Sequence, residues 1–339
     1  MPHMHGELLF HQFDQPSIMS ELGRDRLLFA LHEMLRIRQF ETRAEAAYQQ
    51  GHVGGFFHSY VGQEAIQTAA ISALGKKHWY ITSYRCHALV LLLGEKSNEM
   101  MAELFGKKTG NAKGRGGSMH MYSERMLGGF GIVGGQIPIA TGAAFRNKYL
   151  GITDEIAICF FGDGAVPQGT FHESLNMASI HSIPCLYVVE NNHWSMGTPL
   201  HKTMANHNHF VEKAAEAYDI LYYRLDGMDF FSCYAGFKEA FQHIVKTSRP
   251  VIIECITDRF KGHSISDPAL YRTKEQLKEC MSKDPIGKFK IALLESKICT
   301  ENEIQEIETK SREEMIQAIK FAEESPWPDI SELEEGVYV

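Results

Sequence analysis

The sequence lacks the long apolar runs that mark membrane proteins, because no stretch approaches the ~20 residues that a membrane-spanning helix requires. Residues 1–23 have neither the apolar core of a signal peptide nor the arginine richness of a transit peptide. We therefore expect no membrane association. We also expect a bacterial-type chain that works in the cytoplasm, or the matured form of an imported protein.

The sequence also lacks cysteines that are close together along the chain. Seven cysteines are scattered over 339 residues, and no two of them have Cys-x-x-Cys spacing. An odd number of isolated cysteines in a chain of this length predicts free thiols and a reducing compartment. This pattern argues against both a disulfide framework and a structural zinc site.

An excess of positive charge is the third absence. Lys and Arg number 34 against 42 Asp and Glu, which gives a formal net charge of -8. Without a broad basic field, the chain is unsuited to bind nucleic acid. Basic residues can still gather around one small anionic ligand.

Buried strands that alternate with amphipathic helices are what the sequence does contain. This alternation predicts an α/β fold with an open, mainly parallel sheet, helices on both faces, and helical additions at the N- and C-terminal ends. Strands are predicted at residues 79–82, 156–161, 185–189, 221–225 and 250–257. Helices are predicted at residues 24–50, 63–74, 168–182, 210–217, 230–247, 282–296 and 301–324.

We predict one large domain with short extensions. Residues 1–23 form an N-terminal arm, residues 24–300 form the α/β domain, and residues 301–339 add a C-terminal helix and tail to that domain. Residues 106–135 contain ten glycines. Such a density predicts long loops in which the backbone approaches a ligand closely.

Two neighbouring strands end in polar residues. Gly162-Asp163-Gly164 follows the strand at 156–161, and Asn191-Asn192 follows the strand at 185–189. Adjacent parallel strands lie ~4.8 Å apart, and ligands bind beyond their carboxyl ends. Carboxylate and amide oxygens are hard ligands that suit Mg²⁺. Since the following helix start can bind phosphate, the pattern predicts a magnesium–diphosphate anchor.

Three other interpretations fit this segment less well. Residues 164–170 resemble a P-loop but lack its lysine, and Gly162-x-Gly164 lacks the third glycine of a dinucleotide site. A plain turn capped by Asp163 would explain Gly-Asp-Gly alone. It would not explain why Asn191-Asn192 stands at the end of the next strand.

Gly162-Asp-Gly164 followed by Asn191-Asn192 resembles the thiamine diphosphate motif. Several further segments resemble the alpha subunits of two-chain 2-oxo acid dehydrogenases, pyruvate dehydrogenase in particular, and the resemblance covers about residues 25–338. These segments are His58-Ser-Tyr-Val-Gly-Gln-Glu-Ala65, Ser83-Tyr-Arg-Cys-His87, Gly116-Gly-Ser-Met-His-Met-Tyr122, Gly131-Ile-Val-Gly-Gly-Gln136, Gly262-His-Ser-Ile-Ser-Asp-Pro268 and Tyr271-Arg-Thr273.

The resemblance implies roles for individual residues. It implies that Mg²⁺ is held by Asp163, Asn192 and the backbone carbonyl of Trp194. It implies that His58 and His263 lie beside the reacting end of thiamine diphosphate and act in catalysis. The residues that it implies for binding the cofactor are Tyr84, Arg85, Gly131, Val133, Asp163, Gly164, Ala165 and Asn192.

The resemblance also implies a reaction and its partners. The reaction is oxidative decarboxylation of pyruvate, with transfer of the acetyl group to the lipoyl arm of dihydrolipoyl acetyltransferase. A separate beta subunit would supply the glutamate that acts on the aminopyrimidine, in an α2β2 heterotetramer. Acetoin dehydrogenase, the branched-chain 2-oxo acid enzyme and a non-catalytic cofactor-binding subunit remain alternatives.

The segment 258–273 resembles the mobile loop that guards the active site in this family. Ser264 matches a position that is phosphorylated in animal relatives. However, residues 268–271 are one residue shorter than the animal pattern and lack its second serine. We therefore interpret Ser264 as an ordinary loop hydroxyl.

Overall fold

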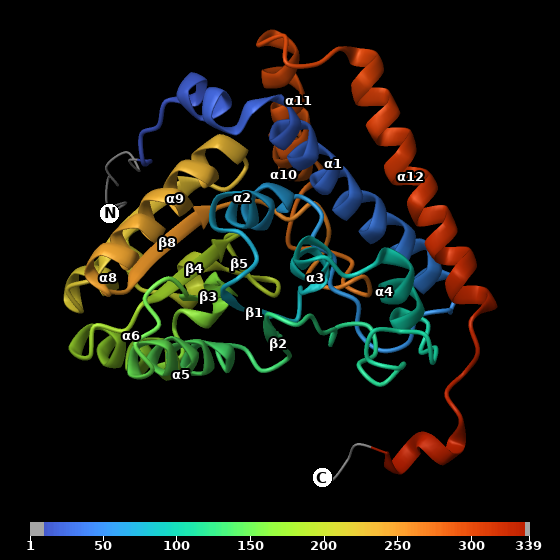
Figure 1. Ribbon diagram of the computed structural model, residues 1–339, viewed down its shortest axis with the longest axis horizontal. Helices are drawn as coiled ribbons and strands as arrows, with labels where there is room; N and C mark the ends of the chain where they lie inside the picture. Colours follow the sequence, from blue (N-terminus) through green and yellow to red (C-terminus); the bar gives the residue numbers. More distant parts are fainter. Residues whose placement is uncertain (1–9, 336–339) are drawn as a thin grey trace.

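A six-stranded parallel sheet forms the centre of the computed structural model, which describes residues 10–335 (Figure 1). All neighbouring strands pair in parallel, which confirms the predicted sheet, and β3 and β4 are adjacent as expected. The strands lie in the order β2 (Met126–Phe130), β1 (Trp79–Ser83), β3 (Ala157–Gly162), β4 (Cys185–Asn191), β8 (Val251–Ile256) and β7 (Leu221–Asp226).

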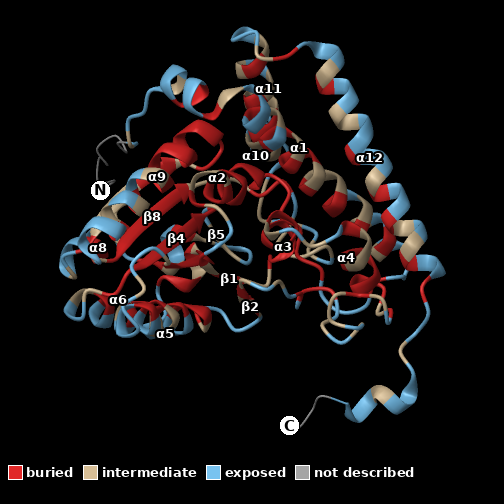
Figure 2. Ribbon diagram, in the orientation of Figure 1, coloured by how far each residue is buried: buried red, intermediate tan, exposed pale blue. Residues whose placement is uncertain are grey.

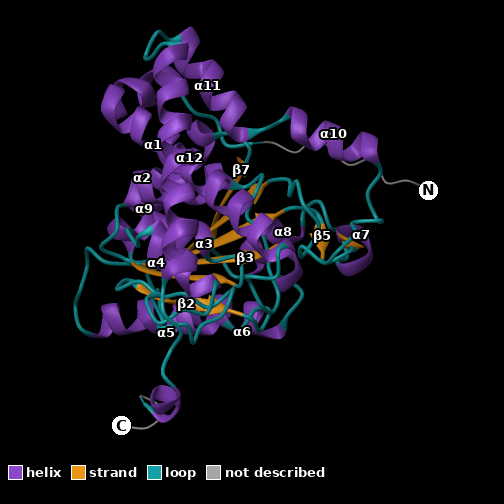
Figure 3. Ribbon diagram, turned by 90° about the vertical axis from the view of Figure 1, so that its right-hand side faces the viewer, coloured by secondary structure: helices purple, strands orange, loops and turns teal. Residues whose placement is uncertain are grey.

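Helices cover both faces of this sheet, as predicted (Figures 1 and 3). One face carries α5 (Gln136–Tyr149), α6 (Gly169–Ile180) and α8 (Phe210–Ala217). The other face carries α2 (Glu64–Leu74) and α9 (Phe230–Thr247). A sheet that is covered on both sides explains why its strands are continuous apolar runs rather than alternating ones.

Side chains of β3 divide between two cores because successive residues of a strand point to opposite faces. Ile158 and Phe160 pack into the core beneath α2 and α9, whereas Cys159 and Phe161 pack into the core beneath α5 and α6. Figure 2 shows the central strands as buried and the outer helix faces as exposed. The middle of the sheet is thus packed on both faces, and residues at the ends of such strands can be positioned accurately.

The helical additions pack beside the sheet. α1 (Gln15–Gln49) runs alongside α12 (Glu301–Glu324), and both contact α4 (Ser97–Leu104). The other helices are α3 (His87–Leu93), α10 (Lys274–Ser282) and α11 (Pro285–Glu295). Sequence patterns did not predict α3, α4, α5 or α10. α3 is apolar on all sides, so it shows no helical period, and Gly135 and Pro138 obscure the start of α5.

The predicted N-terminal arm is helical in part. α1 begins at Gln15 rather than near Arg24, and Gly23 interrupts it with φ 69°. Ile18, Met19 and Leu22 are buried in the main core, so tertiary packing stabilises a segment whose own pattern is weak. Residues 1–9 of the arm lie outside the described residues.

The glycine-rich stretch 106–135 is mostly loop, as predicted, but it also contributes the edge strand β2. Short elements complete the described chain. They are the 3-10 turns η1 (Asp163–Ala165) and η2 (Ile330–Glu334), the hairpin strands β5 (Trp194–Ser195) and β6 (Thr198–Pro199), and α7 (Leu200–Thr203).

All seven cysteines are free thiols, as predicted, and all but Cys280 are buried. Between residues 10 and 335, no helix combines the length and the apolar character needed to cross a membrane.

Candidate functional site

Two polar residues meet where β3 and β4 end. Asp163 directly follows Gly162 at the end of β3, and Asn192 directly follows Asn191 at the end of β4. The parallel register pairs Gly162 with Glu190. The backbone N–H of Asn192 donates to Asp163 Oδ1 at 3.3 Å. The strand tips therefore converge as predicted from the sequence.

Each of these residues holds one buried oxygen that accepts no hydrogen bond, Asp163 Oδ2 and Asn192 Oδ1. Gln63 Oε1 accepts a hydrogen bond from Asn192 Nδ2 at 3.1 Å, which fixes the amide so that its oxygen stays unpaired. Leaving a buried polar group unsatisfied costs about 1–3 kcal/mol. Two such oxygens at one corner therefore indicate a ligand site, and their chemistry suits Mg²⁺.

Burial raises the pKa of the Asp163 carboxyl to about 6, and the positive charge of Arg259 opposes this shift. A bound cation would favour the ionised carboxylate further. Between residues 10 and 335, no group of three or more His, Cys, Asp or Glu side chains is placed to hold a metal ion. A cation here would therefore take further ligands from amide, backbone and bound phosphate oxygens.

A cavity of about 260 Å³ opens on this corner. Gly164 permits a close approach in its wall, since a Cβ there would lie 2.9 Å from Ser195 Oγ. The lining includes nine of the residues implied by the resemblance, namely Tyr84, Arg85, Val133, Asp163, Gly164, Ala165, Asn192, Trp194 and His263.

Two buried arginines give this small cavity its positive charge. Arg85 donates from Nη1 to the carbonyl of Ser59 at 2.7 Å and from Nη2 to the carbonyl of His263 at 2.6 Å. Arg259 donates to the carbonyl of Met196 at 3.1 Å, while its buried Nε has no partner. Both guanidinium groups are held by neutral acceptors, so their charge remains available to an anion.

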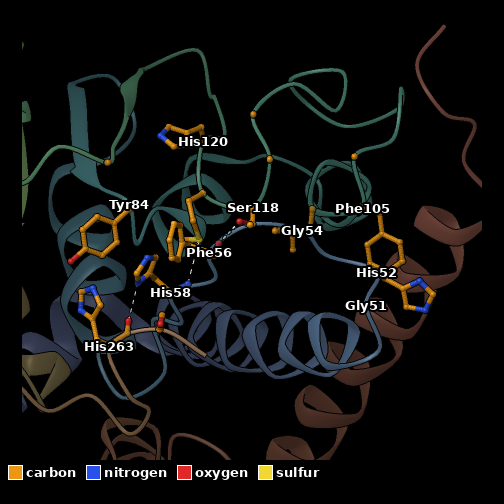
Figure 4. A pocket seen from close by; sticks show the side chains of 18 of the residues that line it. Gly51, His52, Gly54, Phe56, His58, Tyr84, Phe105, Ser118, His120 and His263 are labelled. Atoms are coloured by element: carbon orange, nitrogen blue, oxygen red, sulfur yellow. Dashed lines mark hydrogen bonds between the residues drawn. The ribbon is translucent and has the colours of Figure 1, made fainter. Parts of the chain in front are cut away.

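A larger cavity of about 980 Å³ adjoins the first, because Tyr84, Val133, Met196 and His263 line both. Figure 4 shows His58, Tyr84 and His263 gathered at one end, with His52 and Phe105 at the other. Gly131, the remaining glycine implied for cofactor binding, also lines this cavity. All the implied site residues thus face one of two connected spaces.

The two histidines have fixed and complementary tautomers. His58 Nδ1 lies 2.9 Å from the carbonyl of His263, so it must donate, and Nε2 is left as an acceptor. His263 Nδ1 lies 3.2 Å from Arg259 Nη1, which can only donate, so His263 carries its proton on Nε2. The rings of His58 and His263 stand 4.8 Å apart at 72°.

Both imidazoles are neutral at pH 7. Burial, reinforced by the charge of Arg85, lowers the pKa of His58 to about 4 and that of His263 to about 3. A neutral histidine can accept a proton at one ring nitrogen and donate a hydrogen bond from the other. The pair therefore offers one acceptor and one donor nitrogen where the large cavity adjoins the small one.

The loop that carries His263 is folded around Asp267. Asp267 Oδ2 accepts from the backbone N–H of His263 at 2.6 Å and from the Tyr271 hydroxyl at 2.8 Å, and Oδ1 accepts from Ala269 N at 2.9 Å. The Tyr271 ring packs on Trp194 with centroids 4.7 Å apart. These contacts join the loop 258–273 to the strand-tip corner.

Comparisons with known proteins assign the chain to a family. A family model described as "Dehydrogenase E1 component" matches residues 32–331. The chain belongs to the dehydrogenase E1 component family. The resemblance inferred from the motifs is therefore confirmed, and membership of this family implies thiamine diphosphate as the cofactor.

Individual members of the dehydrogenase E1 family are similar over most of their length. The pyruvate dehydrogenase E1 component subunit alpha of Rickettsia felis is 41% identical over 317 residues, 93% of this chain and 96% of that protein. The subunit of the same name in Rhizobium meliloti is 41% identical over 318 residues, with shares of 93% and 90%. The mitochondrial subunit of Dictyostelium discoideum is 37% identical over 328 residues, with shares of 96% and 86%.

Sequence patterns missed several polar residues of the site. Gln63, Glu190 and Arg259 line the small cavity. Gln63 lies within the segment His58–Ala65, and Glu190 directly precedes Asn191-Asn192, so adjacency to these motifs was an available signal. Arg259 follows β8 as an isolated arginine, and only the fold brings it to Asp163.

Proposed function

We propose that this chain is the alpha subunit of a pyruvate dehydrogenase decarboxylating component. In this proposal it uses thiamine diphosphate and Mg²⁺ for oxidative decarboxylation of pyruvate, and the acetyl group passes to the lipoyl arm of dihydrolipoyl acetyltransferase. The observation that carries this proposal is the pair of unpaired, buried oxygens of Asp163 and Asn192 beside two arginines, in a chain of the dehydrogenase E1 family.

The residues present fit a magnesium–diphosphate group. Asp163, Asn192 and the backbone carbonyl of Trp194 would hold Mg²⁺, and Gln63 would keep the Asn192 oxygen oriented. Tyr84, Gly164 and Ala165, together with Arg85 and Arg259, would hold the diphosphate, and Gly131 and Val133 would line the rest of the cofactor. Thiamine diphosphate, when bound, supplies the electron sink that decarboxylation of a 2-oxo acid requires.

The histidines have distinct roles in this proposal. His263 donates from Nε2 to a carboxylate or carbonyl oxygen of the 2-oxo acid. His58 accepts a proton at Nε2, and its hydrogen bond to the His263 carbonyl holds the ring in place. Their lowered pKa values keep both groups in these states at neutral pH.

We further propose a beta subunit as an obligatory partner, in an α2β2 heterotetramer that acts in the cytoplasm. The relatives are named as alpha subunits, which supports a separate partner chain. Those of Rickettsia and Rhizobium are bacterial, which supports action in the cytoplasm. Large apolar side chains are exposed on neighbouring helices α5 and α6, as expected of a subunit that is covered by another chain. They are Ile139, Phe145, Tyr149, Met177 and Ile180.

The test is reconstitution with the beta chain. We expect the pair to decarboxylate pyruvate in the presence of thiamine diphosphate and Mg²⁺, and the isolated chain to lack this turnover. Full activity of the isolated chain would contradict the need for a partner. Acetoin and 3-methyl-2-oxobutanoate serve as competing substrates, and a preference for either would reassign the substrate. Tight cofactor binding by the pair without turnover of any of them would favour the non-catalytic alternative.

A further inference from the structure

A buried carboxylate lies outside the cofactor corner, near the end of α4. Glu103 has no exposed surface. Its Oε2 accepts from the backbone N–H groups of Ala112 at 2.9 Å and Gly114 at 2.8 Å, and its Oε1 accepts from Gly116 N at 2.7 Å. One side chain thus gathers three amides of the glycine-rich loop, and charge-assisted bonds of this kind are stronger than neutral ones.

The glycines of this loop allow the backbone to close around the carboxylate. A Cβ on Gly110 would lie 2.6 Å from Glu103 Cα, and a Cβ on Gly116 would overlap the carbonyl of His120. Gly114 has φ 76°, a conformation that favours glycine. Glycine is therefore required at positions 110, 114 and 116 for one common reason. A side chain at any of them would prevent the loop from closing around Glu103 in its present conformation.

The same loop continues into the wall of the large cavity. Residues 116–120 line that cavity, as do Leu104 and Phe105, which follow Glu103 directly. Ser118 donates from its hydroxyl to the carbonyl of Phe56, and the backbone N–H of His58 donates to Met119 Sδ at 3.4 Å (Figure 4). A shift of the loop would therefore reach the segment that carries His58.

We propose that Glu103 is a positioning residue for the 2-oxo acid end of the site, acting through the loop 110–119. This inference rests on the proposed function, because it assigns to the substrate the part of the large cavity that His58 and residues 116–120 line. Asp163, Asn192 and Arg259, which would hold the magnesium–diphosphate group, line the small cavity, and no residue between 103 and 120 lines it. We therefore expect the affinity for the cofactor to be insensitive to Glu103. The expected signature is a defect in substrate use without a defect in cofactor affinity.

The first variant is Glu103→Gln, measured in the reconstituted alpha–beta pair. An amide side chain has one oxygen and two N–H groups, so it cannot accept all three backbone bonds. Since displacements of about 1 Å can cost 100-fold in rate, we expect kcat/KM for pyruvate to fall at least tenfold. We expect the Kd for thiamine diphosphate with Mg²⁺ to stay within about twofold, since the metal-binding residues keep their own supporting bonds.

Hydrogen exchange gives a readout that does not depend on turnover. In Glu103→Gln we expect faster exchange at the amides of Ala112, Gly114 and Gly116, and also at the amide of His58. If the pair shows no activity with any 2-oxo acid, the proposed function fails, whereas the His58 amide still reports on positioning. Unchanged exchange at His58 would overturn the inference even in an active enzyme.

A second variant perturbs the loop while keeping the carboxylate. Gly110→Ala should crowd Glu103 and give the same separation between kcat/KM and cofactor Kd, which also covers the case in which Glu103→Gln fails to fold. Glu33→Gln is the matched control, because Glu33 is a buried carboxylate that pairs with Arg36 on α1, outside both cavities. Loss of cofactor affinity in step with kcat/KM, or an equal kinetic defect in Glu33→Gln, would refute the positioning role.

Discussion

The two connected cavities are built in different ways. The small cavity lies on the tips of adjacent strands, where Asp163 and Asn192 are fixed by the sheet and by Gln63. The large cavity is lined by loops from distant parts of the chain, including 51–58, 116–120 and 263–264. The charged anchor thus stands on a sheet that is packed on both faces, whereas the substrate end depends on loops that need their own supports.

If the strand tips hold the magnesium–diphosphate group, replacing the carboxylate of Asp163 should have the largest effect on cofactor binding. Asp163→Asn keeps the size of the side chain and removes its charge. We expect affinity for thiamine diphosphate with Mg²⁺ to fall at least about 100-fold by calorimetry, since a hard cation needs the carboxylate. Because burial already destabilises the ionised carboxylate, the melting temperature of the cofactor-free chain should not fall.

Asp154→Asn is the matched control for Asp163→Asn, because Asp154 is exposed and pairs with Lys77 on the surface. Its cofactor affinity should equal that of the wild type. Equal losses of cofactor affinity in the two variants would show that the strand tips do not hold the magnesium–diphosphate group.

The loop cavity should respond in turnover rather than in cofactor affinity. For His58→Ala we expect kcat to fall about 100-fold, the range typical of a lost proton acceptor. The Kd for thiamine diphosphate should change by less than about threefold, because the diphosphate-binding residues remain in place. Steady-state kinetics and calorimetry on the reconstituted pair would measure both, with half-buried His243→Ala on α9, which lines neither cavity, as control. A large change in the Kd for thiamine diphosphate would contradict the division into a cofactor-binding cavity and a substrate-binding cavity.

A smaller effect tests the support of the anchor. Gln63→Ala frees the Asn192 amide to rotate, so its oxygen no longer faces one direction. We expect about tenfold weaker binding of thiamine diphosphate with Mg²⁺ and an unchanged KM for pyruvate, as for other residues that orient a metal ligand. The same substitution at exposed Gln242 should change neither quantity. A raised KM with intact cofactor affinity would place Gln63 in the substrate end instead.

The pH dependence of stability tests the lowered pKa values of His58 and His263. Unfolded histidines bind protons below about pH 6.5, whereas His58 and His263 stay neutral until about pH 4 and 3 in the folded chain. The unfolded state therefore gains protons first, so stability falls as the pH drops from 6.5 toward 4. Replacing both residues by alanine should flatten this decline in melting temperature between pH 7 and 5. A decline of unchanged slope would mean that other groups cause it.

The smallest effect on activity is expected at Glu64, which adjoins Gln63 but lines neither cavity. Glu64 is fully buried, pairs with Arg38 and accepts from Gly62 N at 3.0 Å. Glu64→Gln should lower the free energy of unfolding by about 1–3 kcal/mol, since Arg38 loses a charged partner. Denaturant titration would measure this, and kcat should stay within about twofold of wild type. A strong loss of kcat would show that the ion pair shapes the site.

Local patterns in the sequence determined much of the sheet. β3 and β4 were predicted from their apolar runs, and the bounds of α8, α9 and α12 match the periodic segments. β2 was missed because its short Met126–Phe130 segment contains two glycines, and only pairing with β1 makes it a strand. α1 was placed too late because the packing of Ile18 and Leu22 stabilises its first turns.

Only part of the candidate site could be predicted from local sequence patterns. Asp163 and Asn192 were predicted from strand ends, because parallel strands bring their carboxyl ends to one edge whatever else the chain does. Tyr84, Arg85, His58 and His263 depended on resemblance, since no period or spacing links residues from separate loops. The support given by Glu103 had no signal in the sequence at all.

The sequence by itself determined that a carboxylate and an amide end neighbouring buried strands, since hydrophobic runs and their polar ends are local properties. Only the tertiary structure decided that Gln63 leaves the Asn192 oxygen unpaired, that Arg259 faces Asp163, and that the two histidines carry opposite tautomers. Those relations join residues far apart in the chain. They depend on distances and directions that arise only after the sheet and its loops have packed.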